Sequence, residues 1–257
     1  MPAPKSFFWY ELMTTDVEAA QAFYTAVVGW QASRWEAPGS SPYIVMNAGE
    51  RGVGGIMEMP DEVRQSGSQP MWLGYIYADD TDTATEGVKN AGGTIYRAPA
   101  DIPDVGRFSV VADPQGVMFM LLHPMGPDQP PVPAGTPGHV GWHELYTSDW
   151  QKAFDFYSSQ FGWTKADAMD MGPMGVYQLF AAGGDPIGGM MNKPAQIPFP
   201  FWQFYFNVLA IEDAAQRVKA NGGQILMDPM EVPGGGWIVQ CMDPQGAAFA
   251  LAAPKRQ

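Results

Sequence analysis

One long stretch of this sequence occurs twice, and that repeat limits the chain to a duplicated architecture. The stretch FWYELMTTDVEAAQAFYTAVVGW begins at Phe8 and returns, without a gap, as GWHELYTSDWQKAFDFYSSQFGW. Trp9 returns as Trp142 and Glu11 as Glu144, in each case 133 positions later (142 − 9). A Gly-Gly pair and an Asp-Pro-Gln-Gly sequence also recur further along. A single repetition of so long a unit predicts two tandem domains rather than a solenoid of short repeats.

Each copy carries the same order of predicted elements. The first opens with an aromatic-rich stretch, residues 7–14, that favours a strand, and Asp16 follows where the N-cap of a helix belongs. Apolar residues then recur at the helical spacing until Gly29. Further strands are expected at residues 43–48, 53–59, 71–78, 94–97, 107–112 and 117–122, helices at 81–91, 150–160 and 211–220, and a closing strand at 247–252. Each half is therefore predicted as βαβββ twice, which is an α+β fold.

Residues 125–138 separate the two copies. This segment is crowded with proline and glycine and shows no apolar periodicity, which is typical of a linker between domains. We therefore predict an N-terminal module at residues 1–124 and a C-terminal module at residues 139–257.

The charge of the chain limits its partners. Its 27 acidic side chains outnumber its 14 basic ones, which gives a formal net charge of −13. Nucleic acids and anionic membrane surfaces attract cationic proteins, so neither is an expected partner. No stretch approaches the ~20 apolar residues of a membrane span, and the N-terminus lacks the pattern of a signal peptide. With Cys241 as its one cysteine, the chain is predicted to be cytoplasmic, and a homodimer is left open.

The two copies resemble the vicinal oxygen chelate (VOC) superfamily, also called the glyoxalase, bleomycin resistance protein and dioxygenase superfamily. The resemblance rests on a strand ending in Thr-Asp or Ser-Asp, a helix that carries Phe-Tyr and closes on Gly-Trp, and a final Asp-Pro-Gln-Gly turn before a strand. It implies two tandem glyoxalase-like modules, each a pair of βαβββ motifs that form a curved, cup-shaped mixed sheet with helices outside. It also implies a small organic ligand in the cup, although this fold hosts many different activities.

The resemblance to metal-using members of this superfamily implies three metal-ligand positions in each module. In this chain those positions hold Trp9, Leu73 and Met120 in the first module, and Trp142, Gln203 and Ala250 in the second. A divalent ion needs several convergent nitrogen or oxygen donors, and of these six residues only Gln203 could supply one. His143 does not restore a site, because strand alternation should turn it toward the helix side of its sheet. The sequence therefore predicts no metal and no other cofactor.

Strand alternation also predicts which side chains line each cup. The candidate ligand-binding residues are Trp9 and Tyr75 in the first cup, and Trp142, Tyr146, Gln203, Tyr205, Asn207 and Ala250 in the second. Met118, Met120 and Leu122 on the first closing strand are replaced by alanines at positions 248, 250 and 252. The second cup is therefore expected to be wider and more polar, and to be the working site.

Glu11 and Glu144 are the candidate catalytic residues. A carboxylate in a partly apolar cup is costly unless it is paired, protonated or used, and a raised pKa would suit a general acid or base beside a carbonyl group. The alternative is a structural role, in which each glutamate pairs with backbone amides or with an arginine, and Arg107 is the candidate partner of Glu11.

Three classes of function follow from these residues. The first is a metal-independent lyase or isomerase that acts through Glu144. The second is a non-catalytic protein that binds or sequesters a small molecule, as the drug-resistance branch of the resemblance implies. The third is a metal-dependent glyoxalase-like or dioxygenase-like enzyme, which requires that the alignment of the three ligand positions be wrong.

Overall fold

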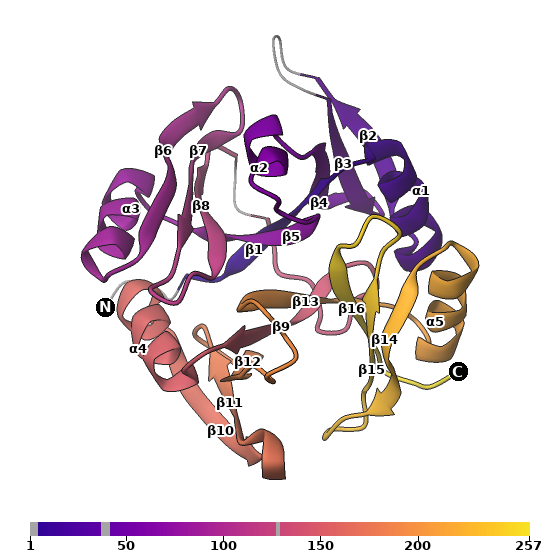
Figure 1. Ribbon diagram of the computed structural model, residues 1–257. Helices are drawn as coiled ribbons and strands as arrows, with labels where there is room; N and C mark the ends of the chain where they lie inside the picture. Colours follow the sequence, from indigo (N-terminus) through magenta and orange to yellow (C-terminus); the bar gives the residue numbers. More distant parts are fainter. Residues whose placement is uncertain (1–4, 37–41, 127–128) are drawn as a thin grey trace. The chain divides into compact units, whose positions relative to one another are not determined.

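The computed structural model describes residues 5–36, 42–126 and 129–257 (Figure 1). The first copy of the repeat forms β1 (Phe7–Thr14), α1 (Val17–Val28), β2 (Gln31–Trp35), β3 (Tyr43–Ala48), β4 (Arg51–Glu58), α2 (Asp61–Gln65), β5 (Met71–Tyr77), α3 (Thr81–Asn90), β6 (Thr94–Ile102), β7 (Gly106–Ala112) and β8 (Met118–Pro124). The second forms β9 (Val140–Thr147), α4 (Trp150–Phe161), β10 (Thr164–Asp170), the 3₁₀ helix η1 (Gly172–Met174), β11 (Val176–Ala181), β12 (Pro186–Asn192), β13 (Phe201–Asn207), α5 (Ile211–Ala220), β14 (Gln224–Glu231), β15 (Trp237–Met242) and β16 (Ala248–Ala253).

Helix α1 shows how the local sequence produces these elements. The Asp16 side chain accepts a hydrogen bond from the amide of Ala19 at 2.9 Å, as an N-cap residue does. Gly29 ends the helix with a φ of +89°, a left-handed conformation that glycine adopts without strain. The repeated helix α4 begins after Asp149 and ends at Gly162 in the same way. The predicted start and end of α1 are confirmed.

The strands form two mixed sheets of eight strands. The first has the order β2-β3-β4-β1-β5-β8-β7-β6, and the second has the corresponding order β10-β11-β12-β9-β13-β16-β15-β14. β1 runs parallel to β4 and β5 runs parallel to β8, whereas β3 and β4, like β7 and β8, run antiparallel. The two copies therefore repeat one topology, and the predicted α+β class is confirmed.

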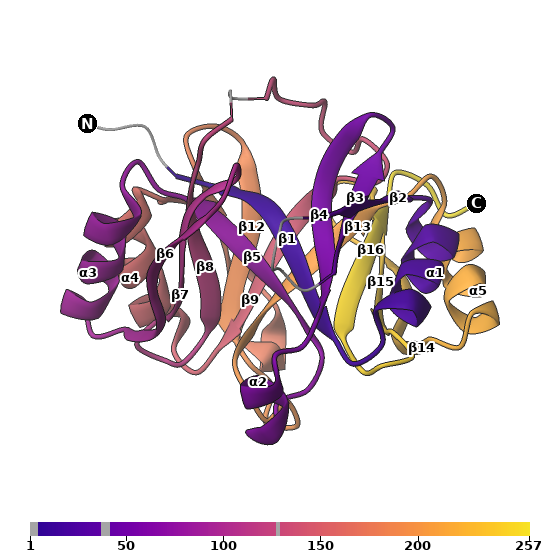
Figure 2. The ribbon, with the colours of Figure 1, turned by 90° about the horizontal axis from the view of Figure 1, so that it is seen from above.

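Two compact units cut across the two sequence copies. One unit consists of Met1–Phe8, Leu73–Pro130 and His143–Trp202, and the other of Trp9–Trp72, Pro131–Trp142 and Gln203–Gln257. In the first unit α3 and α4 lie side by side, and in the second α1 and α5 do so (Figures 1 and 2). Each unit thus combines part of the first copy with part of the second. The module bounds at residues 124 and 139 stay a prediction, and residues 127–128 of the expected linker lie outside the described residues.

A buried chain of three side chains joins the two sequence copies inside each unit. In one unit the Trp72 indole N–H donates to the Tyr24 hydroxyl at 2.8 Å, and that hydroxyl donates to Asp243 Oδ2 at 3.1 Å. Asp243 Oδ1 accepts from the amides of Gln245 and Ala247 in the Asp-Pro-Gln-Gly turn. Burial raises the pKa of Asp243, and the hydrogen bonds oppose that rise. The other unit repeats the chain with Trp202, Tyr157 and Asp113.

The sequence patterns do not predict two edge strands and two short helices. β2 and β10 are mostly exposed and carry no alternation of apolar and polar residues. α2 and η1 are short helices without a buried residue. β6 extends to Ile102 rather than ending at Arg97, with register shifts against β7. Backbone pairing, rather than a buried face, defines these strands, so periodicity cannot reveal them.

No helix in the described part of the chain combines the length and the apolar character that crossing a membrane requires.

Candidate functional site

The last strand, β16, divides its side chains between two faces. Phe249 points toward the helices, because its ring centroid lies 5.7 Å from that of Phe23 and 5.3 Å from that of Tyr24 on α1. Side chains alternate along a strand, so the alanines at positions 248, 250 and 252 line the opposite face. Ala248 and Ala252 are partly exposed on this face, whereas Ala250 between them is buried.

Backbone register places further side chains on this alanine face. Tyr205 of β13 and Gln240 of β15 both pair with Ala250. The C-terminal wall is defined here as Gln203, Tyr205, Asn207, Ile238, Gln240, Met242, Ala248, Ala250 and Ala252, all in one compact unit. On β15 its members are partly exposed, whereas Val239 and Cys241 between them are buried. The wall is therefore the more open face of this strand.

The matching face of the first copy is filled with larger side chains. The N-terminal wall is defined here as Leu73, Tyr75, Phe108, Val110, Ala112, Met118, Met120 and Leu122. In register, Tyr75 pairs with Met120, and Met120 with Val110, and all three side chains are buried. The Arg97 guanidinium also lies over the Phe108 ring at 4.8 Å. The centre of the C-terminal wall is also buried, with Ala250 at 0% and Tyr205 at 2% exposure. The two walls therefore differ in the size and polarity of their side chains, and the choice of the second copy as the working site stays a prediction.

Gln203 holds a buried donor on the C-terminal wall. Its side chain is 3% exposed, and its Nε2 is buried without a hydrogen-bond partner. A buried N–H group left without an acceptor costs ~1–3 kcal/mol, so folded proteins keep few of them. The matching residue of the N-terminal wall is Leu73, which has no such requirement. The Gln203 amide is therefore a candidate contact for an acceptor on a ligand.

Tyr205 and Asn207 use their polar groups in different ways. Gln240 Nε2 donates to the Tyr205 hydroxyl at 3.0 Å, so Gln240 belongs to this polar row although the sequence did not single it out. Asn207 Nδ2 donates to the carbonyl oxygen of Thr136 at 3.3 Å. The carboxamide also lies so close to Gly141 that a Cβ there would come within 2.3 Å of Oδ1. Asn207 therefore holds the chain that precedes β9, which leaves its amide less able to contact a ligand.

Glu11 lies in a hydrogen-bonded chain with two aromatic side chains. Trp9 Nε1 donates to the Tyr43 hydroxyl at 3.0 Å, and this hydroxyl donates to Glu11 Oε2 at 3.0 Å. Burial, followed by the charge of the Glu11 carboxylate, raises the pKa of Tyr43 well above its ordinary value. Gly55 makes the arrangement possible, because a Cβ there would come within 2.0 Å of the Tyr43 hydroxyl oxygen. A neutral tyrosine that donates to Glu11 favours the structural role for this carboxylate.

Glu144 and Tyr146 lie on β9 in the other compact unit. Glu144 is 7% exposed and pairs in register with Gly189 of β12. The Tyr177 ring lies so close to Gly189 that a Cβ there would come within 2.2 Å of it. The second copy therefore repeats the glutamate, glycine and tyrosine positions of the first. Tyr146 stacks on Phe201 with 5.4 Å between ring centroids.

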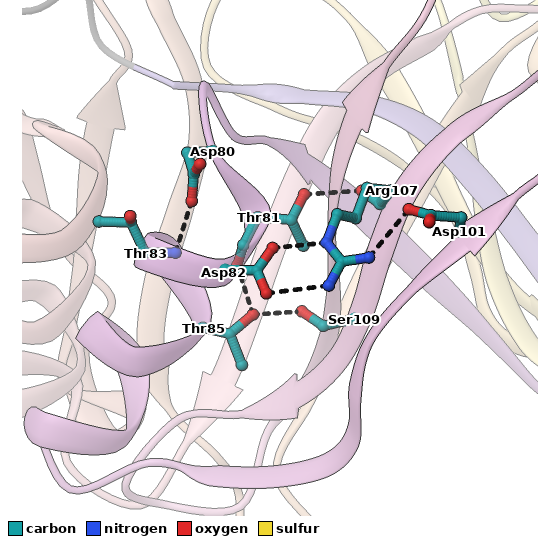
Figure 3. Close-up of polar contacts among 8 residues, drawn as sticks. All are labelled: Asp80, Thr81, Asp82, Thr83, Thr85, Asp101, Arg107 and Ser109. Carbon is teal, nitrogen blue, oxygen red and sulfur yellow. Dashed lines mark hydrogen bonds and ion pairs between the residues drawn. The ribbon is translucent and has the colours of Figure 1, made fainter.

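Arg107, the candidate partner of Glu11, is bonded to Asp82 and Asp101 instead (Figure 3). Its guanidinium donates to both carboxylate oxygens of Asp82, at the first turn of α3, and to Asp101 on β6. Arg107 adjoins Phe108 of the N-terminal wall, so strand alternation turns its side chain toward α3. The prediction of a Glu11–Arg107 pair is wrong. Arg107 instead connects α3 to β6 through exposed ion pairs, which contribute little to stability.

The side chains at the implied metal positions do not fit a divalent ion. Leu73 and Met120 are 3% and 1% exposed, and neither offers the oxygen or nitrogen donor that such an ion needs. The Trp9 indole nitrogen is a donor only, and its N–H is bonded to Tyr43. The second copy supplies a single neutral amide at these positions. Within residues 5–36, 42–126 and 129–257, no group of three His, Cys, Asp or Glu side chains could hold a metal ion.

His143 is a buried neutral histidine. Its Nδ1 lies 2.8 Å from the carbonyl oxygen of Ile187, which can only accept, so Nδ1 carries the proton. The ring stacks on Phe7, with 4.9 Å between centroids and 13° between planes. Burial lowers the pKa of His143 to about 4. These contacts support the structural role expected from the sequence.

The lowered pKa of His143 predicts a loss of stability in acid. Below pH ~6.5 an unfolded histidine binds a proton, whereas folded His143 stays neutral until about pH 4. Its contribution to the free energy of unfolding is therefore full above pH 6.5 and is lost as the pH falls toward 4, by ~2–3 kcal/mol. Urea unfolding at pH 7 and pH 4.5 should show a smaller loss for His143→Phe than for the wild type. Equal losses would contradict this assignment.

Comparison with known families decides where the chain belongs. A model of the glyoxalase/bleomycin resistance protein/dioxygenase superfamily matches residues 6–121 and, a second time, residues 136–251. The chain belongs to this superfamily. Its two matches follow the two copies of the repeat, so the resemblance seen in the sequence is confirmed.

Members of the superfamily with related sequences have diverse names. The chain is 32% identical over 250 residues to a protein of Mycobacterium tuberculosis named "Putative glyoxylase CFP32", a match that covers 97% of this chain and 95% of that protein. It is also 30% identical over 261 residues to "Anthracycline biosynthesis protein DnrV" of Streptomyces peucetius. This match covers 97% of this chain and 93% of that protein.

Solved structures share the fold of this superfamily member at low sequence identity. The Mn(II)-bound glyoxalase from Novosphingobium aromaticivorans has a TM-score of 0.69 and 16% identity, with 99% of this chain and 83% of that chain covered. A 2,2',3-trihydroxybiphenyl 1,2-dioxygenase from Sphingomonas wittichii has a TM-score of 0.68 and 15% identity, with 98% and 91% covered. These likenesses concern the fold.

Proposed function

We propose that this superfamily member binds a small organic molecule with a carbonyl or similar acceptor on the C-terminal wall, without a divalent ion. The observation that carries the proposal is the buried Nε2 of Gln203, which has no hydrogen-bond partner. A ligand acceptor would satisfy that donor and remove the cost of leaving it bare. The related proteins named for glyoxylase and for anthracycline biosynthesis are in keeping with a ligand of this chemistry.

The donor chemistry supports binding without a metal. The family's ligand positions hold one neutral amide and otherwise hydrocarbon, indole or thioether groups, which do not hold hard or borderline divalent ions. The amide donor of Gln203 would then take over the polarisation of the ligand oxygen. A hydrogen bond polarises a carbonyl less than a Lewis acid does, so binding is a more direct consequence of this wall than fast chemistry.

An enzymatic role remains the second candidate. Glu144 is a buried carboxylate at a strand position repeated from Glu11, and buried carboxylates are frequent general acids and bases. In this candidate the protein is a lyase or isomerase. A variant with Glu144→Gln that binds ligand as the wild type does, but turns none over, would favour the enzyme. Loss of binding in the same variant would assign Glu144 to the binding surface.

The proposal is tested by comparing two probes that differ in one acceptor. Equilibrium dialysis of chelator-treated protein would measure binding of 4-hydroxyacetophenone and of 4-ethylphenol, which lacks the carbonyl group. We expect the ketone to bind about tenfold more tightly, because ~1.4 kcal/mol from one satisfied donor corresponds to that factor. In the Gln203→Leu variant the preference should disappear. A preference that survives this change, or that requires added Zn²⁺ or Mn²⁺, would contradict the proposal.

A further inference from the structure

We propose that the hairpin of β10 and β11 holds a Cu(I) ion through the sulfur atoms of Met169, Met171 and Met174. The two strands are joined by the short helix η1, and the three methionines lie at this connection (Figure 1). The methionine turn is defined here as residues 169–175, all in one compact unit. This site is separate from the C-terminal wall and does not depend on the ligand proposed for that wall.

The methionines of this turn are not core residues. Met174 is 53% exposed, and Met169 and Met171 are partly exposed, although methionine is usually buried in folded proteins. Both methionines of the neighbouring strand β12 are buried, as is usual. The corresponding segment of the first copy, residues 31–42, holds no methionine. Core packing therefore does not account for three thioether groups in one turn.

Backbone pairing turns Met169 and Met171 to the same side of the hairpin. Met169 pairs in register with Tyr177 of β11. The amide of Met171 donates to the carbonyl oxygen of Gly175 at 2.8 Å, which continues the same antiparallel pairing toward the turn. Side chains two positions apart on a strand point to the same face. The side chains of Met169 and Met171 are therefore neighbours.

The turn itself places Met174 beside Met171. The amide of Met174 donates to the carbonyl oxygen of Met171 at 3.3 Å, and side chains at positions i and i+3 of a 3₁₀ turn lie one above the other. Gly172 and Gly175 have φ values of +59° and +83°, which glycine adopts without strain. Met171 thus adjoins one methionine along the strand and the other along the turn. Three flexible side chains can then direct their sulfur atoms at one ion.

The donor set of the methionine turn selects a soft cation. Thioether sulfur suits Cu(I), whereas Mg²⁺, Ca²⁺ and Mn²⁺ need oxygen donors. Asp170 does not supply one, because strand alternation turns it to the other face, where its carboxylate accepts from the amide of Gly172 at 2.9 Å. The net charge of −13 attracts a cation at long range. A soft cation therefore satisfies both the donor chemistry and the charge.

Nuclear magnetic resonance of the methionine methyl groups tests the inference on the whole chain. Protein labelled with ¹³C at these methyl groups would be titrated with Ag(I), a redox-stable ion that also prefers sulfur ligands, and with Cu(I) under nitrogen. The signals of the three methionines, assigned from single leucine substitutions, should shift together and stop shifting at one ion per chain. The remaining signals of the 17 methionines should stay in place. Mg²⁺ should leave all of them unchanged.

Leucine substitutions measure what the sulfur atoms contribute, because leucine is apolar and lacks the sulfur. Met174→Leu should weaken Ag(I) binding about tenfold, and Met171→Leu/Met174→Leu about a hundredfold. Met125→Leu is the matched control and should bind as the wild type does, because Met125 is 72% exposed in the same compact unit but lies outside the methionine turn. Circular dichroism would confirm that each variant is folded, and Met174→Leu alone serves if the double variant is not.

Three results would contradict the inference. If the Met125 signal shifts as much as the three signals of the turn, without saturation, single thioethers bind the ion and there is no built site. A shift of only one of the three signals would show that they do not share an ion. Unchanged affinity in Met171→Leu/Met174→Leu would place the ion elsewhere, and the free thiol of Cys241 would be the next ligand to test.

Discussion

Replacing Gln203 by leucine is expected to make the protein more stable while removing its ligand binding. Leucine is close to glutamine in size and stands at the matching position, Leu73, of the first copy. The variant removes a buried N–H group that has no acceptor, so the free energy of unfolding should rise by ~1–3 kcal/mol. A residue that costs stability and is needed for binding is typical of functional sites. Urea unfolding, measured without ligand, gives the first quantity, and dialysis with 4-hydroxyacetophenone gives the second.

Gln178 provides a matched control for this result. It is also buried, at 6% exposure, but its Nε2 donates to the carbonyl oxygens of Ala166 and Leu179 at 2.8 and 3.0 Å. Gln178→Leu leaves those acceptors without their donor, so this variant should lose ~1–3 kcal/mol of stability. The two substitutions are chemically identical, and opposite signs are expected. A loss of stability in both would show that the Gln203 amide has a partner in the folded protein.

Asp243→Ala is expected to cause the largest loss of stability among the substitutions considered. The carboxylate accepts from the Tyr24 hydroxyl and from the amides of Gln245 and Ala247, and Asp243 is 2% exposed. The change leaves three buried donors without acceptors, at ~1–3 kcal/mol each before relaxation. Burying the Asp243 carboxylate is itself unfavourable, as its raised pKa indicates. The alanine variant no longer has that cost, which offsets part of the loss of stability. We expect a net loss of ~3 kcal/mol or more.

Urea unfolding of Asp243→Ala, Asp113→Ala and Asp228→Ala checks that expectation. Asp113 has the same role in the other compact unit, with Tyr157 as its donor, and should give a similar loss. Asp228 is exposed on β14, and its replacement should change stability by no more than ~0.5 kcal/mol. A loss below ~1 kcal/mol at Asp243 would mean that the buried chain of Trp72, Tyr24 and Asp243 contributes little to folding.

The repeat and the local caps made most of the fold predictable from the sequence. β1, β3 and α5 have the expected bounds, because each combines a clear hydrophobic pattern with a recognisable start or end. β2 and β10 are predicted poorly since their residues are exposed and polar. The role of the Asp-Pro-Gln-Gly aspartate was also hidden. The turn itself is local, but Asp243 contacts Tyr24, which lies 219 positions away.

The candidate site was predictable in part, for physical reasons that differ from residue to residue. Alternation on β13 and β16 correctly grouped Tyr205 with Ala250. Gln240 was missed because one sequence does not reveal which residues of neighbouring strands lie opposite one another. Only the structure shows that Gln240 of β15 pairs with Ala250 and contacts Tyr205. Tyr43 was missed as the partner of Glu11. Tyr177 repeats Tyr43 134 positions later (177 − 43), and each tyrosine ring lies against a glycine of the repeated Gly-Gly pair. Comparing the two copies for shared tyrosines would have found it.

The side-chain amide of Gln203 gives the most direct test of binding by an uncharged donor without a metal. In ¹⁵N-labelled, chelator-treated protein, its NH₂ resonances can be assigned as the pair that disappears in Gln203→Leu. On addition of 4-hydroxyacetophenone, one proton of that pair should shift downfield and exchange more slowly, because it gains an acceptor where none is present now. Unchanged Gln203 resonances in the presence of bound probe, or shifts that appear only after a divalent ion is added, would contradict the proposal.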